Sequence, residues 1–316
     1  MKYCFFVNPA AGTGKEADIL VERIHGLMRE RGQAFNYKVV ITKGTDDGII
    51  RAHDLARDLN GEPAKFFVAG GDGSINEVLN GVFGYGNVAI GVIPIGTGND
   101  AIRNFTDVGD FLSLEQQLNG HTKKIDILKY TGEINGRHQT RYCINMFNIG
   151  FDCNVVRLTL KLKQKPFISG SLAYLMAVAG NVIKKSGISL TIKENDEVIR
   201  EGDMLLCAVS NGAYCGGGIK SAPLAKMDDG EFDVNIINDV SRLKFMKLFP
   251  GFRRGDHAGS MRGIENVIDM RRMKSVELLP YGKEELTICV DGEIQNTRGI
   301  KIEICPEALN FIVPKA

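Results

Sequence analysis

Short apolar runs alternate with helical patterns over residues 1–128, and this alternation constrains the fold more than any other feature of the sequence. The apolar runs are rich in β-branched and aromatic residues and lie at 2–7, 37–41, 65–69 and 88–93. The segments with helical spacing lie between them, at 15–31, 46–59 and 74–83. Nearly continuous apolar strands separated by helices are typical of a parallel sheet that helices cover on both faces. We therefore predict a doubly wound α/β domain over 1–128.

The pattern changes after residue 128, where the turn signals Thr131-Gly132 and Asn135-Gly136 separate short runs. The runs typical of strands lie at 141–149, 187–193, 203–210, 232–238, 274–279, 286–291 and 299–305. Helical segments interrupt them at about 153–163, 170–184 and 241–249. We predict a second domain over 129–307 that is mainly antiparallel β with inserted helices. The sequence does not decide to which of the two domains the last strand, within 308–316, belongs.

Composition excludes several classes of protein. The chain has 316 residues, of which 44% are hydrophobic and 24% charged, and this excludes disordered and coiled-coil chains. Lys and Arg number 39 against 38 Asp and Glu, so the chain lacks the basic excess of duplex-binding proteins, and we expect no nucleic-acid partner. The longest nearly apolar stretch, 171–183, is shorter than the roughly 20 residues of a spanning helix.

Other features concern the compartment and the membrane. The seven cysteines are scattered, and the opening run at 2–7 is a strand pattern rather than a secretory leader. We therefore expect reduced thiols, no zinc site and a cytoplasmic protein. The region 242–274 carries nine Lys or Arg and three Asp or Glu. It is either a solvated face or a surface for transient contact with anionic lipid at the inner face of the membrane.

The strongest functional signal is the glycine-rich turn Gly70-Gly71-Asp72-Gly73-Ser74, which joins the expected strand at 65–69 to a helix. Glycines let the backbone approach a phosphate, and the amides and dipole of a helix N-terminus favour an anion. An acidic residue in an anion site makes sense when a cation accompanies the phosphate, so Asp72 indicates a Mg²⁺–nucleotide complex. The alternative is a plain tight turn with Asp72 as a helix cap.

Two further loops follow strands in the same way. They are Pro94-Ile95-Gly96-Thr97-Gly98-Asn99-Asp100 and Asn8-Pro9-Ala10-Ala11-Gly12-Thr13-Gly14-Lys15. The second is not a Walker A loop, because its glycine spacing fails and Glu16 follows Lys15. Ligands of open α/β sheets bind in the crevice outside the carboxyl ends of the strands. We therefore expect these loops to face one crevice.

Together the three loops resemble the catalytic domain of the diacylglycerol kinase superfamily, which includes sphingosine and ceramide kinases, and most closely its soluble bacterial lipid kinases. The resemblance covers essentially the whole chain. Ser74 stands where the family has Thr, and Ala101 stands where Phe is common. The resemblance implies an ATP- and Mg²⁺-dependent kinase that phosphorylates the hydroxyl of a lipid alcohol such as diacylglycerol.

The resemblance also implies a nucleotide site that includes Asp72 as a catalytic candidate. The implied contacts come from the three loops, from Thr42 after the second strand and from the start of the following helix. They are Asn8, Pro9, Ala10, Ala11, Gly12, Thr42, Gly70, Gly71, Asp72, Gly73, Ser74, Ile75, Asn76, Gly96, Thr97, Asn99 and Asp100.

An Asp-Gly-Glu motif in the second half takes its role from the same resemblance. Asp291-Gly292-Glu293 ends the run at 286–291. Glu293 is implied to be the general base that takes the proton of the acceptor hydroxyl, a task that suits a positioned carboxylate. On spacing alone, an ordinary β-turn is favoured there.

Metal ligands are implied at two places. In Lys226-Met227-Asp228-Asp229-Gly230-Glu231, the carbonyls of Lys226 and Glu231 and the carboxylate of Asp229 would hold a structural Mg²⁺, which prefers oxygen ligands. An Asp-Asp-Gly turn explains the same residues without a metal. Asp126, between two isoleucines, is implied to join an acidic network with Asp72, Asp100 and Asp229, and a capping or ion-paired Asp is its alternative.

Two other functions stay open. A small-molecule kinase related to NAD kinase or phosphofructokinase shares a Gly-Gly-Asp-Gly loop, although the loops at 8–15 and 96–100 argue against it. A non-catalytic nucleotide- or lipid-binding regulator would use the same scaffold, although every matched acid is present. The sequence names neither the acceptor lipid nor the nucleotide donor, and it leaves a homodimer open.

Overall fold

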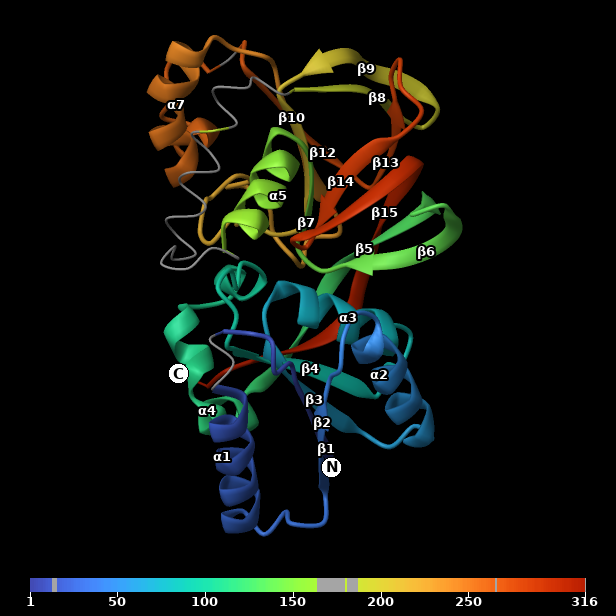
Figure 1. Cartoon of the computed structure of the whole chain (residues 1–316), viewed down its shortest axis with the longest axis vertical. Coiled ribbons are helices and arrows are strands. Elements are labelled where there is room, and N and C mark those ends of the chain that lie inside the picture. Colours follow the sequence, from blue (N-terminus) through green and yellow to red (C-terminus); the bar gives the residue numbers. More distant parts are fainter. Residues whose placement is uncertain (13–15, 164–179, 181–186, 265, 316) are drawn as a thin grey trace. The chain divides into compact units, whose positions relative to one another are not determined.

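The computed structural model describes residues 1–12, 16–163, 180, 187–264 and 266–315. The chain divides into two compact units, whose elements are labelled in Figure 1. The first unit comprises Met1–Asp126 and Pro306–Ala316, and the second comprises Ile127–Cys305.

The first unit contains a parallel sheet in the order β15-β4-β3-β1-β2. Its strands are β1 (Lys2–Val7), β2 (Tyr37–Ile41), β3 (Ala64–Gly70), β4 (Val88–Pro94) and the end of β15 (Glu293–Val313). The strands β3 and β4 are buried almost throughout because both of their faces are covered. This arrangement confirms the predicted doubly wound α/β class.

Helices cover both faces of this sheet, with α1 and α4 on one side and α2 and α3 on the other (Figure 1). Leu20, Ile24 and Met28 of α1 pack with Phe5 and Phe67 of the sheet. The helical elements of the unit are α1 (Glu16–Glu30), α2 (Asp47–Asp58), α3 (Asp72–Val82), α4 (Leu114–Leu118) and the 3₁₀ turns at Ala101–Asn104 and Val108–Leu112.

The second unit is antiparallel, in the order β12-β11-β10-β7-β14-β15, and β15 also pairs with β13 and β5. Besides β15, its strands are β5 (His121–Ile134), β6 (Arg137–Cys143), β7 (Met146–Gly150), β8 (Ile188–Glu194), β9 (Glu197–Met204), β10 (Leu206–Ser210), β11 (Phe232–Ile237), β12 (Ile268–Met273), β13 (Ser275–Pro280) and β14 (Leu286–Val290). A large apolar core lies among these strands and includes Tyr130 and Phe147, whose rings meet edge to face.

Helices interrupt the strands of the second unit, as predicted. They are α5 (Phe151–Lys163), α7 (Arg242–Arg254) and a 3₁₀ turn at Asp256–Ala258. The helix expected at 170–184 lies, apart from residue 180, outside the described residues. Within the described ranges, none of the helices is both long and apolar enough to cross a bilayer.

Three local expectations were wrong, and the first is the single strand at 203–210, which is divided at Leu205 between β9 and β10. The run at 141–149 is divided between β6 and β7, because the backbone at Ile144 and Asn145 leaves the ladder to donate N–H groups to the carboxylate of Asp291. The Thr131-Gly132 pair is not a turn but lies inside β5, opposite Thr140 and Gln139 of β6.

Candidate functional site

The loops at the carboxyl ends of β1, β2, β3 and β4 lie side by side in the first unit. The Thr42 N–H donates to the Val7 carbonyl at 3.0 Å, which places the end of β2 beside the end of β1. The Gly96 N–H donates to the Gly70 carbonyl at 3.1 Å, which joins the loops after β4 and β3. Parallel pairing thus brings the predicted nucleotide loops to one edge of the sheet.

Asn8 ties the first of these loops to the helix that follows β3. Its side-chain Nδ2 donates to Ser74 Oγ at 2.9 Å, and its Oδ1 accepts from the Ala10 N–H at 2.9 Å. Ala11 N–H donates to the Asn8 carbonyl at 3.1 Å, so a tight turn exposes Pro9 and Ala10. The rest of the predicted loop, residues 13–15, lies outside the described residues.

The Asp72 carboxylate joins the loops after β3 and β4. Its Oδ1 accepts hydrogen bonds from the N–H groups of Asp100 at 2.9 Å and Ala101 at 3.2 Å. Asp72 therefore caps the first turn of the helix at Ala101–Asn104 rather than its own helix, α3. Two charge-assisted hydrogen bonds fix the orientation of this carboxylate.

Two glycines allow these loops to approach each other closely. A Cβ on Gly96 would lie 2.5 Å from the Gly71 Cα. A Cβ on Gly98 would lie 2.8 Å from Asp72 Oδ2 and 3.6 Å from Asp100 Oδ2. The two carboxylates thus face the same bare stretch of backbone, which only a residue without a side chain can provide.

The loop after β4 also contains a buried oxygen that accepts no hydrogen bond from the residues that the structure describes. Asn99 has a positive φ of 53° and donates from Nδ2 to the Gly96 carbonyl at 2.8 Å. Its buried Oδ1 has no hydrogen-bond partner among the described residues. Asp100 is buried beside it, with Arg103 Nε 3.6 Å from its Oδ1, while Thr97 is exposed at the tip of the loop.

These residues fit a nucleotide polyphosphate with a divalent cation. The glycine turns leave room for phosphate oxygens, and the first turn of α3 brings amides that lack helical partners. The Asp72 and Asp100 carboxylates and the Asn99 Oδ1 are oxygen ligands of the kind that a divalent cation prefers.

Three residues of the predicted nucleotide and metal sites have side chains that are buried in the structure. The side chain of Ile75 is fully buried in the core, so only its backbone faces the loops, and Asn76 is buried with its Oδ1 accepting from Asn80 at 3.0 Å. Both lie on the inner face of α3. Asp126 is buried, and its Oδ1 accepts from the Glu307 N–H at 2.8 Å, which fixes β5 against the last segment of the chain. Its acidic network stays a prediction.

The Asp291-Gly292 turn positions Glu293 in the second unit. Asp291 and Gly292 have φ of 46° and 89°, and they connect β14 to β15 so that Val290 pairs with Glu293. Glu293, the predicted base, is half-buried at the start of β15.

The Asp291 carboxylate holds this turn in place. It accepts from the N–H groups of Ile144, Asn145 and Met146 at 2.9 to 3.1 Å, and from the Cys143 thiol at 3.2 Å. Burial, and then the nearby carboxylate, raise the pKa of the Cys143 thiol well above its ordinary value, which keeps it a donor.

The acidic side chains of the segment predicted to bind a structural metal are ion-paired with an arginine of β12. Arg272 contacts Asp229 Oδ2 through Nη2, lies 3.3 Å from Glu231 Oε2, and places Nε 3.6 Å from Asp233 Oδ1. A carboxylate that a guanidinium already neutralises is a poor metal ligand. As arranged here, the Asp229 carboxylate is ion-paired with Arg272, while a structural Mg²⁺ held with the carbonyls of Lys226 and Glu231 stays a prediction.

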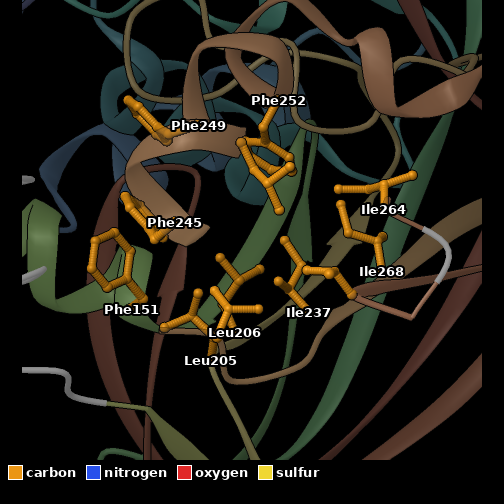
Figure 2. Close-up of a pocket in the computed structure, with 12 residues that line it drawn as sticks. Phe151, Leu205, Leu206, Ile237, Phe245, Phe249, Phe252, Ile264 and Ile268 are labelled. Carbon is orange, nitrogen blue, oxygen red and sulfur yellow. The ribbon is translucent and has the colours of Figure 1, made fainter. Parts of the chain in front are cut away.

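An apolar pocket lies between α7 and the sheet of the second unit (Figure 2). It encloses about 450 Å³, a volume that includes space open to solvent. The described residues that line it are all apolar, and they are Phe151, Leu205, Leu206, Ile237, Val240, Phe245, Leu248, Phe249, Phe252, Ile264, Val267 and Ile268. A lining of this kind is compatible with an acyl chain.

Sequence reasoning missed some residues that organise the site. Glu77 on α3 accepts the N–H groups of Asp46 at 3.0 Å and Gly48 at 3.2 Å, which fixes the start of α2 beyond Thr42. The Ser74-x-x-Glu77 spacing was a signal, although Glu77 caps α2 and not its own helix. No sequence signal connected Arg272 with Asp229, which is 43 positions away.

A glycine-rich phosphate site on a doubly wound sheet, followed in the chain by an antiparallel β unit, fits a kinase. Comparison with known families agrees: the "Diacylglycerol kinase catalytic domain" matches residues 2–130, and the "YegS C-terminal NAD kinase beta sandwich-like domain" matches residues 145–313. The chain belongs to the diacylglycerol kinase catalytic-domain family and carries the C-terminal domain of its YegS-like lipid kinases.

Individual relatives support the assignment. A protein named diacylglycerol kinase from Staphylococcus epidermidis (strain ATCC 35984) is 30% identical over 90% of this chain and 84% of its own length. A diacylglycerol kinase from Staphylococcus carnosus is 28% identical over 90% and 86%. A crystal structure of a diacylglycerol kinase from Bacillus anthracis matches the fold with a TM-score of 0.63 at 21% identity, over 98% of this chain and 96% of that chain.

Proposed function

We propose that the chain is an ATP- and Mg²⁺-dependent lipid kinase that transfers the γ-phosphoryl group to the hydroxyl of a lipid alcohol such as diacylglycerol. The single observation that carries the choice of acceptor is the pocket of the second unit, whose lining side chains, among the described residues, are all apolar. A sugar phosphate or a dinucleotide would need polar partners there, because unpaired polar groups are costly to bury.

Phosphoryl transfer requires positioning and charge stabilisation more than covalent chemistry. The loops at Asn8, Gly70–Ser74 and Gly96–Asp100 would hold the nucleotide phosphates. Asp72 and Asp100 would hold the Mg²⁺, which neutralises phosphate charge when bound. The hydrogen bonds of Asp72 to the backbone support this role, because a carboxylate fixed in advance needs no reorganisation during the reaction.

Glu293 is the proposed general base of the second unit. A carboxylate at the start of a strand, after a turn that the buried Asp291 anchors, has a defined position. It would accept the proton of the acceptor hydroxyl as the oxygen attacks the γ-phosphorus, and a base of this kind contributes about 10²–10⁴-fold to the rate.

The test is incubation of the full chain with γ-labelled ATP and Mg²⁺ in three parallel reactions. One contains diacylglycerol and other lipid alcohols in mixed micelles, one contains NAD, and one contains fructose 6-phosphate. We expect label only in the lipid extract. Label in NAD or the sugar would establish the small-molecule alternative, and nucleotide binding without transfer to any acceptor would favour the regulator.

A further inference from the structure

The outward face of α7 leaves large apolar side chains in solvent. Leu243 is 76% exposed and Met246 is 56% exposed, one turn apart on the same side of the helix. The helix is well formed, since the Ser241 Oγ accepts from the Lys244 N–H at its start and Gly255 ends it with a φ of 85°. The exposed pair therefore belongs to an ordered surface.

The inward face of the same helix already has its partners. Phe245, Phe249 and Phe252 of α7 line the apolar pocket together with Leu206 and Ile237 of the sheet (Figure 2). Phe245 stacks on Phe249 with ring centroids 5.3 Å apart. Packing in the second unit thus accounts for the aromatic residues on the inward face of α7, but it does not account for the apolar side chains of Leu243 and Met246.

Positive charge surrounds the exposed pair. The helix contains five basic residues, Arg242, Lys244, Lys247, Arg253 and Arg254, and no Asp or Glu. All five are exposed. Arg254 is ion-paired, since its Nη2 lies 2.5 Å from Asp256 Oδ2 just beyond the helix. An exposed apolar centre with a basic surround is complementary to a surface that is anionic outside and apolar beneath.

We propose that α7 is the helix by which this chain docks on an anionic bilayer, an inference that rests on the proposed lipid kinase function. The helix lies along the interface with Leu243 and Met246 among the acyl chains and its basic side chains at the phosphates. Since a helix is about 10–12 Å across, its aromatic face brings the apolar pocket to within one helix diameter of the membrane.

The test is co-sedimentation of the full chain with vesicles of phosphatidylcholine, with and without phosphatidylglycerol. We expect binding only to the anionic vesicles, and weaker binding as salt rises. The double variant Leu243→Asn/Met246→Asn should bind at least about tenfold more weakly. Lys244→Glu/Lys247→Glu should also bind at least about tenfold more weakly, since each basic residue near the surface is worth roughly fivefold.

Two matched control variants test whether a loss of vesicle binding is specific to substitutions on α7. Ile19→Asn removes a side chain that is 69% exposed on α1, and Lys283→Glu reverses an exposed charge in the second unit away from α7. Both should bind vesicles like the wild type. All variants change exposed side chains, so thermal unfolding should stay within about 2 °C of the wild type. Equal binding by the α7 variants and the controls, or binding to neutral vesicles alone, would overturn the proposal.

Activity on two forms of the acceptor separates this proposal from the lipid kinase function. The α7 variants should phosphorylate monomeric dioctanoylglycerol at the wild-type rate and lose activity on long-chain diacylglycerol in anionic vesicles. A wild type that binds anionic vesicles through α7 but phosphorylates neither acceptor would refute the kinase function alone. A wild type that is active on both acceptors without vesicle binding would refute the docking helix alone.

Discussion

The Asp72 carboxylate accepts a 2.9 Å hydrogen bond from the backbone N–H of Asp100, and this bond links the turns that follow two neighbouring parallel strands, β3 and β4. The same oxygen accepts from Ala101 at 3.2 Å. Asp72 thus has a structural task, which is to hold the two loops together, in addition to the proposed catalytic task. Substitutions can separate the two.

Asp72→Asn should abolish most activity while the fold survives, because an amide oxygen can still accept the two backbone hydrogen bonds but carries no charge for a cation. We expect turnover to fall by about 10²–10³-fold, the effect of losing one preorganised electrostatic group. Asp72→Ala should lose activity and also about 2–3 kcal/mol of unfolding free energy, because it leaves buried donors unpaired. Steady-state kinetics and urea unfolding measure both effects. Asp18→Asn, on the exposed side of α1, is the control, and near-normal turnover of Asp72→Asn would show that Asp72 is only a cap.

Asp291 should matter for stability more than any other acid of the second unit. Asp291→Ala leaves the N–H groups of Ile144, Asn145 and Met146 without their shared acceptor. We expect a loss of at least about 3 kcal/mol of unfolding free energy. Glu285→Ala, at an exposed position just before β14, should change it by less than about 0.5 kcal/mol. Urea unfolding followed by circular dichroism compares them, and equal stability of both variants would contradict the anchoring role.

The Arg272 guanidinium should take the place of a structural metal in the second unit. Arg272→Ala leaves Asp229, Glu231 and Asp233 close together without their shared cation, so its melting temperature should fall. Added Mg²⁺ should raise the melting temperature of this variant by binding to the freed carboxylates, and should leave that of the wild type nearly unchanged. An equal rise with Mg²⁺ in both proteins, measured without nucleotide, would show a metal site that Arg272 does not occupy.

His257 should make the stability of the second unit depend on pH. Its ring is buried against Phe252, with Nε2 3.2 Å from the Ser221 carbonyl, and burial lowers the pKa of the imidazole below its ordinary value of about 6.5. The unfolded chain therefore takes up the proton more readily than the folded chain. The contribution of neutral, buried His257 to the free energy of unfolding is fully present above about pH 6.5. It is lost as the pH falls from there through the lowered pKa of the imidazole. In urea unfolding across this range, His257→Gln should lose less stability on acidification than the wild type, and equal losses would exclude this role.

Local patterns predicted the first unit well because each of its strands is buried on both faces. The runs at 2–7 and 37–41 coincide with β1 and β2, and the runs at 65–69 and 88–93 are one residue short of β3 and β4 at some ends. In the turns that follow these strands, close neighbours leave no space for a Cβ at some positions, as at Gly96. Such positions require glycine, so the glycine-rich turns of the nucleotide site could be recognised in the sequence.

The second unit was harder to predict because much of it is decided by distant partners. The strand β9 is exposed along most of its length and β12 is half-exposed, so neither shows an apolar run. Gly132 looked like part of a turn, but its missing side chain lets the Gly299 carbonyl approach, since a Cβ would lie 2.2 Å from that oxygen. The pairing of Arg272 with Asp229 likewise depends on β12 lying beside β11, which no local pattern reveals.

The most direct measurement is lipid phosphorylation by Glu293→Gln, with nucleotide affinity determined on the same protein by calorimetry. The glutamine keeps the size of the side chain but cannot accept the proton, and Glu285→Gln at an exposed position of the same unit is the control. We predict a fall in kcat of about 10²–10⁴-fold, or roughly 3–5 kcal/mol of barrier, with nucleotide binding unchanged. A fall of less than about tenfold would show that Glu293 is not the base, and a collapse of nucleotide binding would contradict the division of labour between the two units.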